Sequence, residues 1–220
     1  MKSIRKNRSR RQQALRSLTF LLVLLLFSCA TGLVSFLPMQ ARRTLEKQEA
    51  VGHTQVIRSL SGSAVSGSPL ERYYLCANDN VVMLAGTCLS LFGWQPRFAS
   101  TAPLDDDLPV HAAFQISLAK DGRRYFCVFG QVDDPSVRHI TVEGTAFNDS
   151  RDIAIQLEIP DSDYIVKNGK TYFLTCSADL FSSGLPDDDT LSFSNKYILT
   201  CYDVDMHQLA RCEIGYGLWT

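Results

Sequence analysis

The sequence predicts an all-β protein: an antiparallel β-sandwich of immunoglobulin-like general architecture, preceded by one transmembrane helix. Three observations lead to this prediction. A run of twenty residues near the N-terminus carries no charge, apolar and polar residues alternate with a period of two from residue 72 onward, and turn-forming clusters separate the alternating runs. The first observation is typical of a membrane span, and the other two are typical of short strands in packed sheets.

The N-terminal segment has the length and the flanking charges of a signal anchor. Residues 18–37 read "LTFLLVLLLFSCATGLVSFL", and twenty helical residues reach about 30 Å, the thickness of the hydrocarbon core of a bilayer. Residues 1–38 contain seven basic and no acidic side chains. By the positive-inside rule we expect residues 1–17 to be a basic cytoplasmic stub and residues 18–38 to cross the membrane once, with the rest of the chain extracytoplasmic.

Cys29 leaves two other fates open for this segment. The small residues of "SCA", which ends at Ala30, suit cleavage by a signal peptidase, and a cysteine after "LFS" is a possible lipid attachment site, although Phe27 is bulky for that role. The apolar run nevertheless continues past Cys29 to Pro38. This continuation favours a retained anchor, in which Cys29 is a small apolar residue in lipid.

The charge of the remaining chain excludes one class of partner. Beyond residue 38 the chain has 15 basic and 23 acidic residues. A surface with net negative charge repels phosphate backbones, so we expect no nucleic-acid partner.

The expected extracytoplasmic part divides into a stalk and a domain. Residues 39–67 are mostly helix-permissive and end in the Gly/Ser-rich "SGSAVSGS", so we interpret them as a stalk with a flexible linker. Residues 68–220 form the predicted sandwich domain. Within it "IAIQLEI" at 153–159 alternates as a half-buried strand does, and Asp121-Gly122 and Asn168-Gly169 indicate type I′ hairpins. Eight to ten short strands predict two packed antiparallel sheets, with a barrel as the alternative.

Six cysteines lie beyond residue 38, and their spacing does not decide between disulfides and core packing. No CxxC or CxxH spacing occurs, so we expect no zinc site. If the last hairpin turns between Met206 and His207, Cys201 lies opposite Cys212. These two cysteines are the candidate disulfide pair.

One segment has the composition of a recognition surface. The stretch "LSLFGWQPRFAS" at 89–100 mixes bulky aromatic side chains with Gly, Pro and Arg, and aromatic and Arg side chains dominate binding energies. The candidate binding residues are Phe92, Trp94, Arg97 and Phe98. The alternative is a loop that packs over the edge of the sandwich.

Nothing in the sequence indicates catalysis, a metal or another cofactor. HExxH, GxSxG and phosphate-binding glycine motifs are absent, and the aspartate runs at 105–107 and 187–189 are expected to be solvated turns. We therefore expect a non-enzymatic module, anchored in the membrane through residues 18–37, with a binding or structural role in the cell envelope and a protein or polymer partner there. The alternative is an envelope hydrolase or thiol enzyme whose site the sequence does not reveal.

Overall fold

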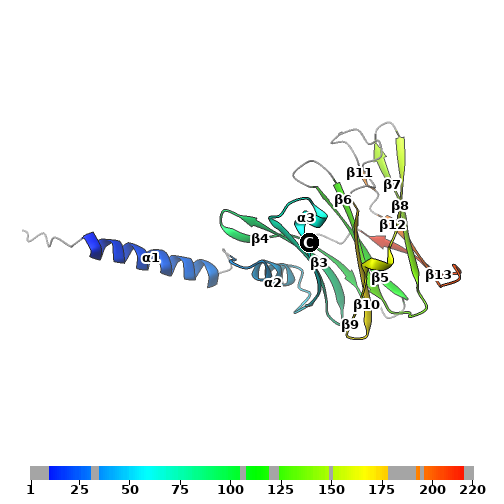
Figure 1. Ribbon diagram of the computed structural model, residues 1–220, viewed down its shortest axis with the longest axis horizontal. Coiled ribbons are helices and arrows are strands. Elements are labelled where there is room, and N and C mark those ends of the chain that lie inside the picture. The colour runs from blue at the N-terminus through cyan, green and yellow to red at the C-terminus, as the bar shows by residue number, and fades with distance from the viewer. Residues whose placement is uncertain are drawn as a thin grey trace, which may run out of the picture.

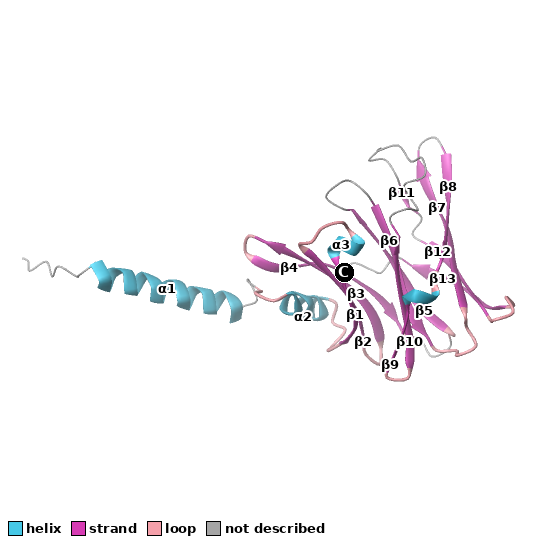
Figure 2. Cartoon of the chain, viewed as in Figure 1, coloured by secondary structure: helices cyan, strands magenta, loops and turns pink. Residues whose placement is uncertain are grey.

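The structure is a computed structural model that describes residues 10–30, 35–104, 108–118, 124–148, 151–177, 192–193 and 196–215 (Figure 1). Strands make up most of these residues, and every strand pair is antiparallel (Figure 2). The all-β, antiparallel prediction is confirmed.

The first helix, α1 (Arg10–Ala30), projects away from the folded body (Figure 1). Among the residues whose side chains are described, no helix is both long and apolar enough to cross a membrane. The predicted transmembrane helix is therefore not found, and residues 31–34 of the expected span lie outside the described residues.

The strands form three sheets, where the sequence indicated two. Sheet A has the order β1-β2-β3-β4, sheet B the order β5-β6-β10-β9, and sheet C the order β11-β7-β12-β13 with β8 paired to β7. The strands of sheet A are β1 (Gln55–Ser61), β2 (Glu71–Ala77), β3 (Val81–Ser90) and β4 (Gly93–Pro103). Those of sheet B are β5 (Val110–Leu118), β6 (Arg124–Val132), β9 (Tyr164–Lys167) and β10 (Lys170–Ser177), and the short helix η1 (Asp161–Asp163) precedes β9. Those of sheet C are β7 (His139–Asn148), β8 (Arg151–Glu158), β11 (Ser192–Phe193), β12 (Lys196–Tyr202) and β13 (Gln208–Gly215).

Sheet B is the middle layer of the stack because its strands present apolar side chains on both faces. Phe126 and Val128 of β6 belong to the core shared with sheet C. Cys127 and Phe129, the alternate residues of the same strand, belong to the core shared with sheet A. Successive side chains of a strand point to opposite faces, so a strand that is apolar at every position requires cover on both sides.

The expected stalk and linker, residues 39–67, are part of the fold. Helix α2 (Pro38–Gln48) buries Ala41, Arg42, Leu45 and Glu46, which lie on one face at helical spacing, and Leu45 packs against the outer face of sheet A. Strand β1 and the short helix α3 (Gly62–Val65) follow. Gly62 is enclosed, since a Cβ there would lie 2.3 Å from the carbonyl oxygen of Ser68. The Gly/Ser composition reflects close packing at this point, not a flexible linker.

The two described hairpin predictions have different outcomes. Asn168 and Gly169 join β9 to β10 with φ of 54° and 77°, as a type I′ turn requires. In the last hairpin the Asp203 carboxylate accepts hydrogen bonds from the amides of Asp205 (2.9 Å) and His207 (2.8 Å), which produces a longer turn.

The predicted pairing of the last two cysteines is consequently wrong. The longer turn is followed by a bulge at Leu209 of β13, opposite Cys201 and Tyr202, and the register shifts. Cys201 lies opposite Ala210, and Cys212 lies opposite Leu199. The two cysteines are diagonal neighbours and not partners.

Candidate functional site

The end of the domain from which α1 emerges, which we call the proximal end, carries the features that suggest a function. It consists of residues 35–37, helix α2 and the tip of the β3–β4 hairpin, which points toward α1 (Figure 1). The backbone fixes these parts to one another, because the amide of Trp94 donates to the carbonyl of Ser35 at 2.7 Å.

Exposed apolar side chains gather at the proximal end. At the hairpin tip Leu91 is 99% and Phe92 71% exposed, although both are large apolar residues. The amide of Leu89 donates to the carbonyl of Leu70 at 2.7 Å, so the α3–β2 connection lies beside the hairpin. We call this set the apolar collar: Phe36, Leu37, Met39, Leu70, Leu89, Leu91 and Phe92, all exposed.

Six of the seven collar residues lie in parts of the chain without charges, and the seventh, Leu70, precedes Glu71 and Arg72. Residues 86–96, which form the hairpin end, contain no charged side chain, and neither do residues 17–41. A monomeric soluble protein rarely leaves apolar side chains grouped in this way. The arrangement is therefore suited to contact with another apolar surface.

The structure separates the four predicted binding residues. Phe92 is at the exposed tip, and Trp94 is partly buried at the start of β4. Arg97 forms an ion pair with Glu71, and Phe98 is 3% exposed, with its ring 5.8 Å from that of Tyr73. The segment consists of the end of β3, a turn at Leu91 and Phe92 and the first part of β4, and the side chains within β4 alternate between the core and the surface.

A buried carboxylate lies between the hairpin and α3. Glu71 accepts hydrogen bonds from the hydroxyls of Ser66 (2.5 Å) and Tyr73 (2.9 Å) and pairs with Arg97. Burial, together with the charge of Glu71, raises the pKa of Tyr73, so this phenol is a stable donor. The charges are satisfied internally, and the group holds the base of the hairpin to α3.

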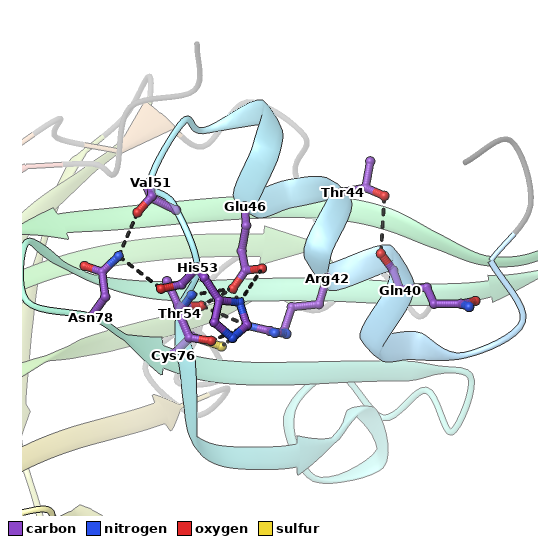
Figure 3. A network of polar contacts seen from close by, with 9 residues as sticks. All are labelled: Gln40, Arg42, Thr44, Glu46, Val51, His53, Thr54, Cys76 and Asn78. Carbon is purple, nitrogen blue, oxygen red and sulfur yellow. Dashed lines mark hydrogen bonds and ion pairs between the residues drawn. The ribbon is translucent and has the colours of Figure 1, made fainter. Parts of the chain in front are cut away.

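A second buried polar network attaches α2 to sheet A (Figure 3). Arg42 is 1% exposed, and its Nη1 donates to Glu46 (2.7 Å) and to the hydroxyl of Thr54 (2.8 Å). The same nitrogen lies 3.4 Å from the sulfur of Cys76. Glu46 also accepts from the amide of Thr54 at 2.8 Å.

The protonation states in this network indicate a structural role. Burial acts to raise the pKa of Glu46, but the hydrogen bonds from Thr54 and the charge of Arg42 outweigh it, so the pKa lies below its ordinary value. Burial raises the pKa of the Cys76 thiol despite the nearby Arg42. A protonated, fully buried thiol is not a nucleophile. The sequence offered only the i, i+4 spacing of Arg42 and Glu46 as a signal, and this spacing is more often found on a solvated helix face.

The other candidate groups do not assemble into a site within the described parts of the chain. Asp203, Asp205 and His207 lie close together, but they are at an exposed turn that their own hydrogen bonds explain. The aspartate runs at 105–107 and 187–189 and the turn at Asp121-Gly122 fall outside the described residues.

No known protein family, curated protein or solved structure matches this chain.

The geometry of the proximal end thus supports contact with another apolar surface. The charged groups of its two buried networks pair with one another. The apolar collar is uncharged, and α2 beside it exposes Arg43 and Lys47. Such an apolar surface gains free energy by leaving water.

Proposed function

We propose that this protein is a membrane-attached extracytoplasmic β-domain that acts as a binding or spacing module in the cell envelope. One observation carries the proposal. From residue 18 onward helix α1 carries no charge and is mostly apolar on every side, and nothing in the described part of the chain covers it. Nine of its large apolar side chains are each more than half exposed: Leu15, Leu18, Phe20, Leu21, Leu22, Val23, Leu24, Leu26 and Phe27.

A helix that is apolar on every side is stable only when something surrounds it. The sequence continues this apolar run from α1 through residue 37, to a total of twenty uncharged residues. A lipid bilayer surrounds such a segment without further specificity, so residues 18–37 are the proposed attachment.

The direction of attachment follows from charge. The seven basic residues of 1–38 all precede the apolar run, at positions 2 to 16. Such a bias retains the N-terminal side in the cytoplasm, which leaves the β-domain in the envelope. Its partner is then an envelope protein or polymer.

The alternative, a thiol enzyme, requires an accessible thiol with a lowered pKa. The thiols whose pKa departs from the ordinary value all shift upward, and burial contributes to each shift: Cys76, Cys176, Cys201 and Cys212. These directions favour the binding module.

Alkaline extraction of membranes tests the attachment. We expect the full chain to remain in the membrane pellet after washing with carbonate, because lipid covers α1. The double variant Leu21→Arg/Leu24→Arg should release it, since each arginine at the centre of an apolar helix costs about 3 kcal/mol in lipid. As a matched control, Gln156→Arg on the exposed face of β8 should stay in the pellet.

Two outcomes would contradict the attachment. One is release of the unmodified full chain by carbonate, and the other is unchanged retention of the Leu21→Arg/Leu24→Arg variant. Crosslinking in intact cells, followed by identification of the captured molecule, then tests the binding role.

A further inference from the structure

We infer that the apolar collar, of which only Phe36 and Leu37 belong to the proposed attachment, is a further membrane contact that inserts into the interfacial layer of the lipid bilayer beside the attachment point of α1. This inference rests on the proposed attachment through residues 18–37 and adds that the folded domain itself touches lipid. The domain would then lie against the membrane and not extend from it on a flexible stalk.

The position of the collar is the first argument. Five peptide units separate Ala30, the last residue of α1, from Ser35, so these two residues are at most about 18 Å apart. Ser35 in turn is paired with Trp94 at the base of the hairpin tip. The tip therefore lies near the end of the helix that is proposed to be in lipid, and Figure 1 shows the β3–β4 hairpin extending in that direction.

The preformed shape of the tip is the second argument. The Ser90 hydroxyl donates to the carbonyl of Gly93 at 3.0 Å and accepts from the amide of Phe92 at 3.2 Å. Gly93 has a φ of 97°, which L residues with side chains rarely adopt. These hydrogen bonds fix the backbone of the turn, and the side chains of Leu91 and Phe92 stay exposed.

The chemistry of the collar is the third argument. Large apolar side chains of an interfacial segment bury themselves about 5–10 Å deep at the boundary between headgroups and acyl chains, and Trp is enriched at the same level. The collar supplies Leu91 and Phe92 at the tip, and Trp94 lies just behind them. The collar residues carry no charge, so their insertion desolvates no ion. Insertion of this kind also needs no anionic lipid, whose headgroups the net negative charge of the rest of the domain would repel.

Fluorescence quenching by brominated lipid tests the contact in the full chain. Trp94 and Trp219 are the two tryptophans of the sequence, so Trp219→Phe leaves Trp94 as the reporter. The protein is incorporated into phosphatidylcholine vesicles whose acyl chains are brominated near the carbonyl end. We expect quenching of Trp94, and we expect Leu91→Asp/Phe92→Asp to lower it at least about twofold as the charged tip leaves the lipid.

The distal hairpin provides a matched control. Val204 and Met206 are also exposed apolar residues at a turn, but this hairpin joins β12 to β13 on the side of the domain away from α1 (Figure 1). The variant Val204→Asp/Met206→Asp should leave the quenching of Trp94 unchanged.

Three results would overturn the inference. The first is absence of quenching in vesicles that retain the chain through a carbonate wash, which would leave the attachment intact. The second is equal quenching in the tip and control variants. The third is protection of Trp94 from aqueous quenchers without quenching by brominated lipid, because a second copy or another protein would then cover the collar. Failure of the chain to associate with the vesicles would instead contradict the proposed function.

Discussion

Arg42 illustrates how a single residue determines where a segment lies. Its guanidinium and the Glu46 carboxylate are both buried, which is tolerable because they pair with each other and Thr54 bonds to both, although Nε of Arg42 has no partner among the described residues. We therefore predict that Arg42→Met destabilises the protein by about 3–5 kcal/mol, since it leaves the Glu46 carboxylate buried without its arginine partner.

Chemical denaturation of three variants checks this prediction. The double variant Arg42→Met/Glu46→Leu should recover much of the loss, because no buried charge remains. The exposed neighbour Arg43 is the control, and Arg43→Met should change the free energy of unfolding by about 0.5 kcal/mol or less. If Arg42→Met behaved like Arg43→Met, the network would not hold α2 to the sheet.

Cys127 and Cys176 are the cysteines that the fold brings together. They are direct cross-strand partners in β6 and β10, and opposed residues lie about 4.5–5.5 Å apart at Cα, within the range of a disulfide. The six described cysteines are free thiols. The hydrogen bond between Cys127 and Cys176, together with burial, raises the pKa of Cys176, so exchange should be slow at neutral pH.

We predict that oxidised glutathione closes this pair and no other. The two thiols lose two protons and two electrons, and the glutathione disulfide accepts the electrons and is reduced to two thiols. Mass spectrometry under non-reducing conditions should find a Cys127–Cys176 peptide. Cys201 and Cys212 serve as the internal comparison because diagonal positions lie about 7–8 Å apart, and a Cys201–Cys212 crosslink would contradict the register of β12 against β13.

The middle sheet, sheet B, has no room for an additional side-chain atom where β6 contacts β5 and β10 at Gly130. A Cβ on Gly130 of β6 would lie 2.1 Å from the carbonyl oxygen of His111 on β5 and 2.7 Å from the ring of Phe173 on β10. The first contact is backbone and cannot be relieved by a rotamer change. We predict that Gly130→Ala costs about 1–3 kcal/mol or more, measured by thermal unfolding.

Gly215 at the end of β13 is the matched control, because a Cβ there would meet nothing within 4 Å. Gly215→Ala should leave the melting temperature nearly unchanged. Equal effects of the two substitutions would contradict the close approach of β5 and β6.

The alternation of single strands was predictable from the sequence. In the stretch at 153–159 the structure buries Ile155, Leu157 and Ile159, and it exposes the residues between them, as a period of two requires. The Asn-Gly turn at residue 168 was equally readable, because few dipeptides adopt two successive positive φ angles.

The number of layers was not predicted, and the reason is physical. Strands of a two-layer sandwich alternate, whereas β6 is buried from Tyr125 through Val132, and β3 is buried from Val81 through Thr87. Continuous burial of this kind indicates cover on both faces. Sheet B is covered on both faces by other sheets, and sheet A is covered on its outer face by α2. The charged residues Arg42 and Glu46 of α2 made it resemble a solvated stalk helix in sequence, although both are buried.

The arrangement of the helices and sheets in the whole molecule suggests how the domain is used. The apolar helix α1, the apolar collar and α2 lie at one end, and sheets A, B and C follow in layers (Figure 1). The exposed face of β8 in sheet C is polar, with Gln156 and Glu158 in solvent. A layered stack of this kind suits the proposed module, which would hold a partner-facing surface at a fixed distance from the membrane.

Protease accessibility in intact cells tests the central claim most directly, namely that a membrane-attached helix carries this β-domain outside the cytoplasm. Protease added to the outside of intact cells should remove the domain and leave a small N-terminal fragment in the membrane. Permeabilised cells should give the same loss of the domain, and a cytoplasmic marker protein should resist digestion until permeabilisation. Complete protection of the domain in intact cells, with digestion only after permeabilisation, would contradict the account.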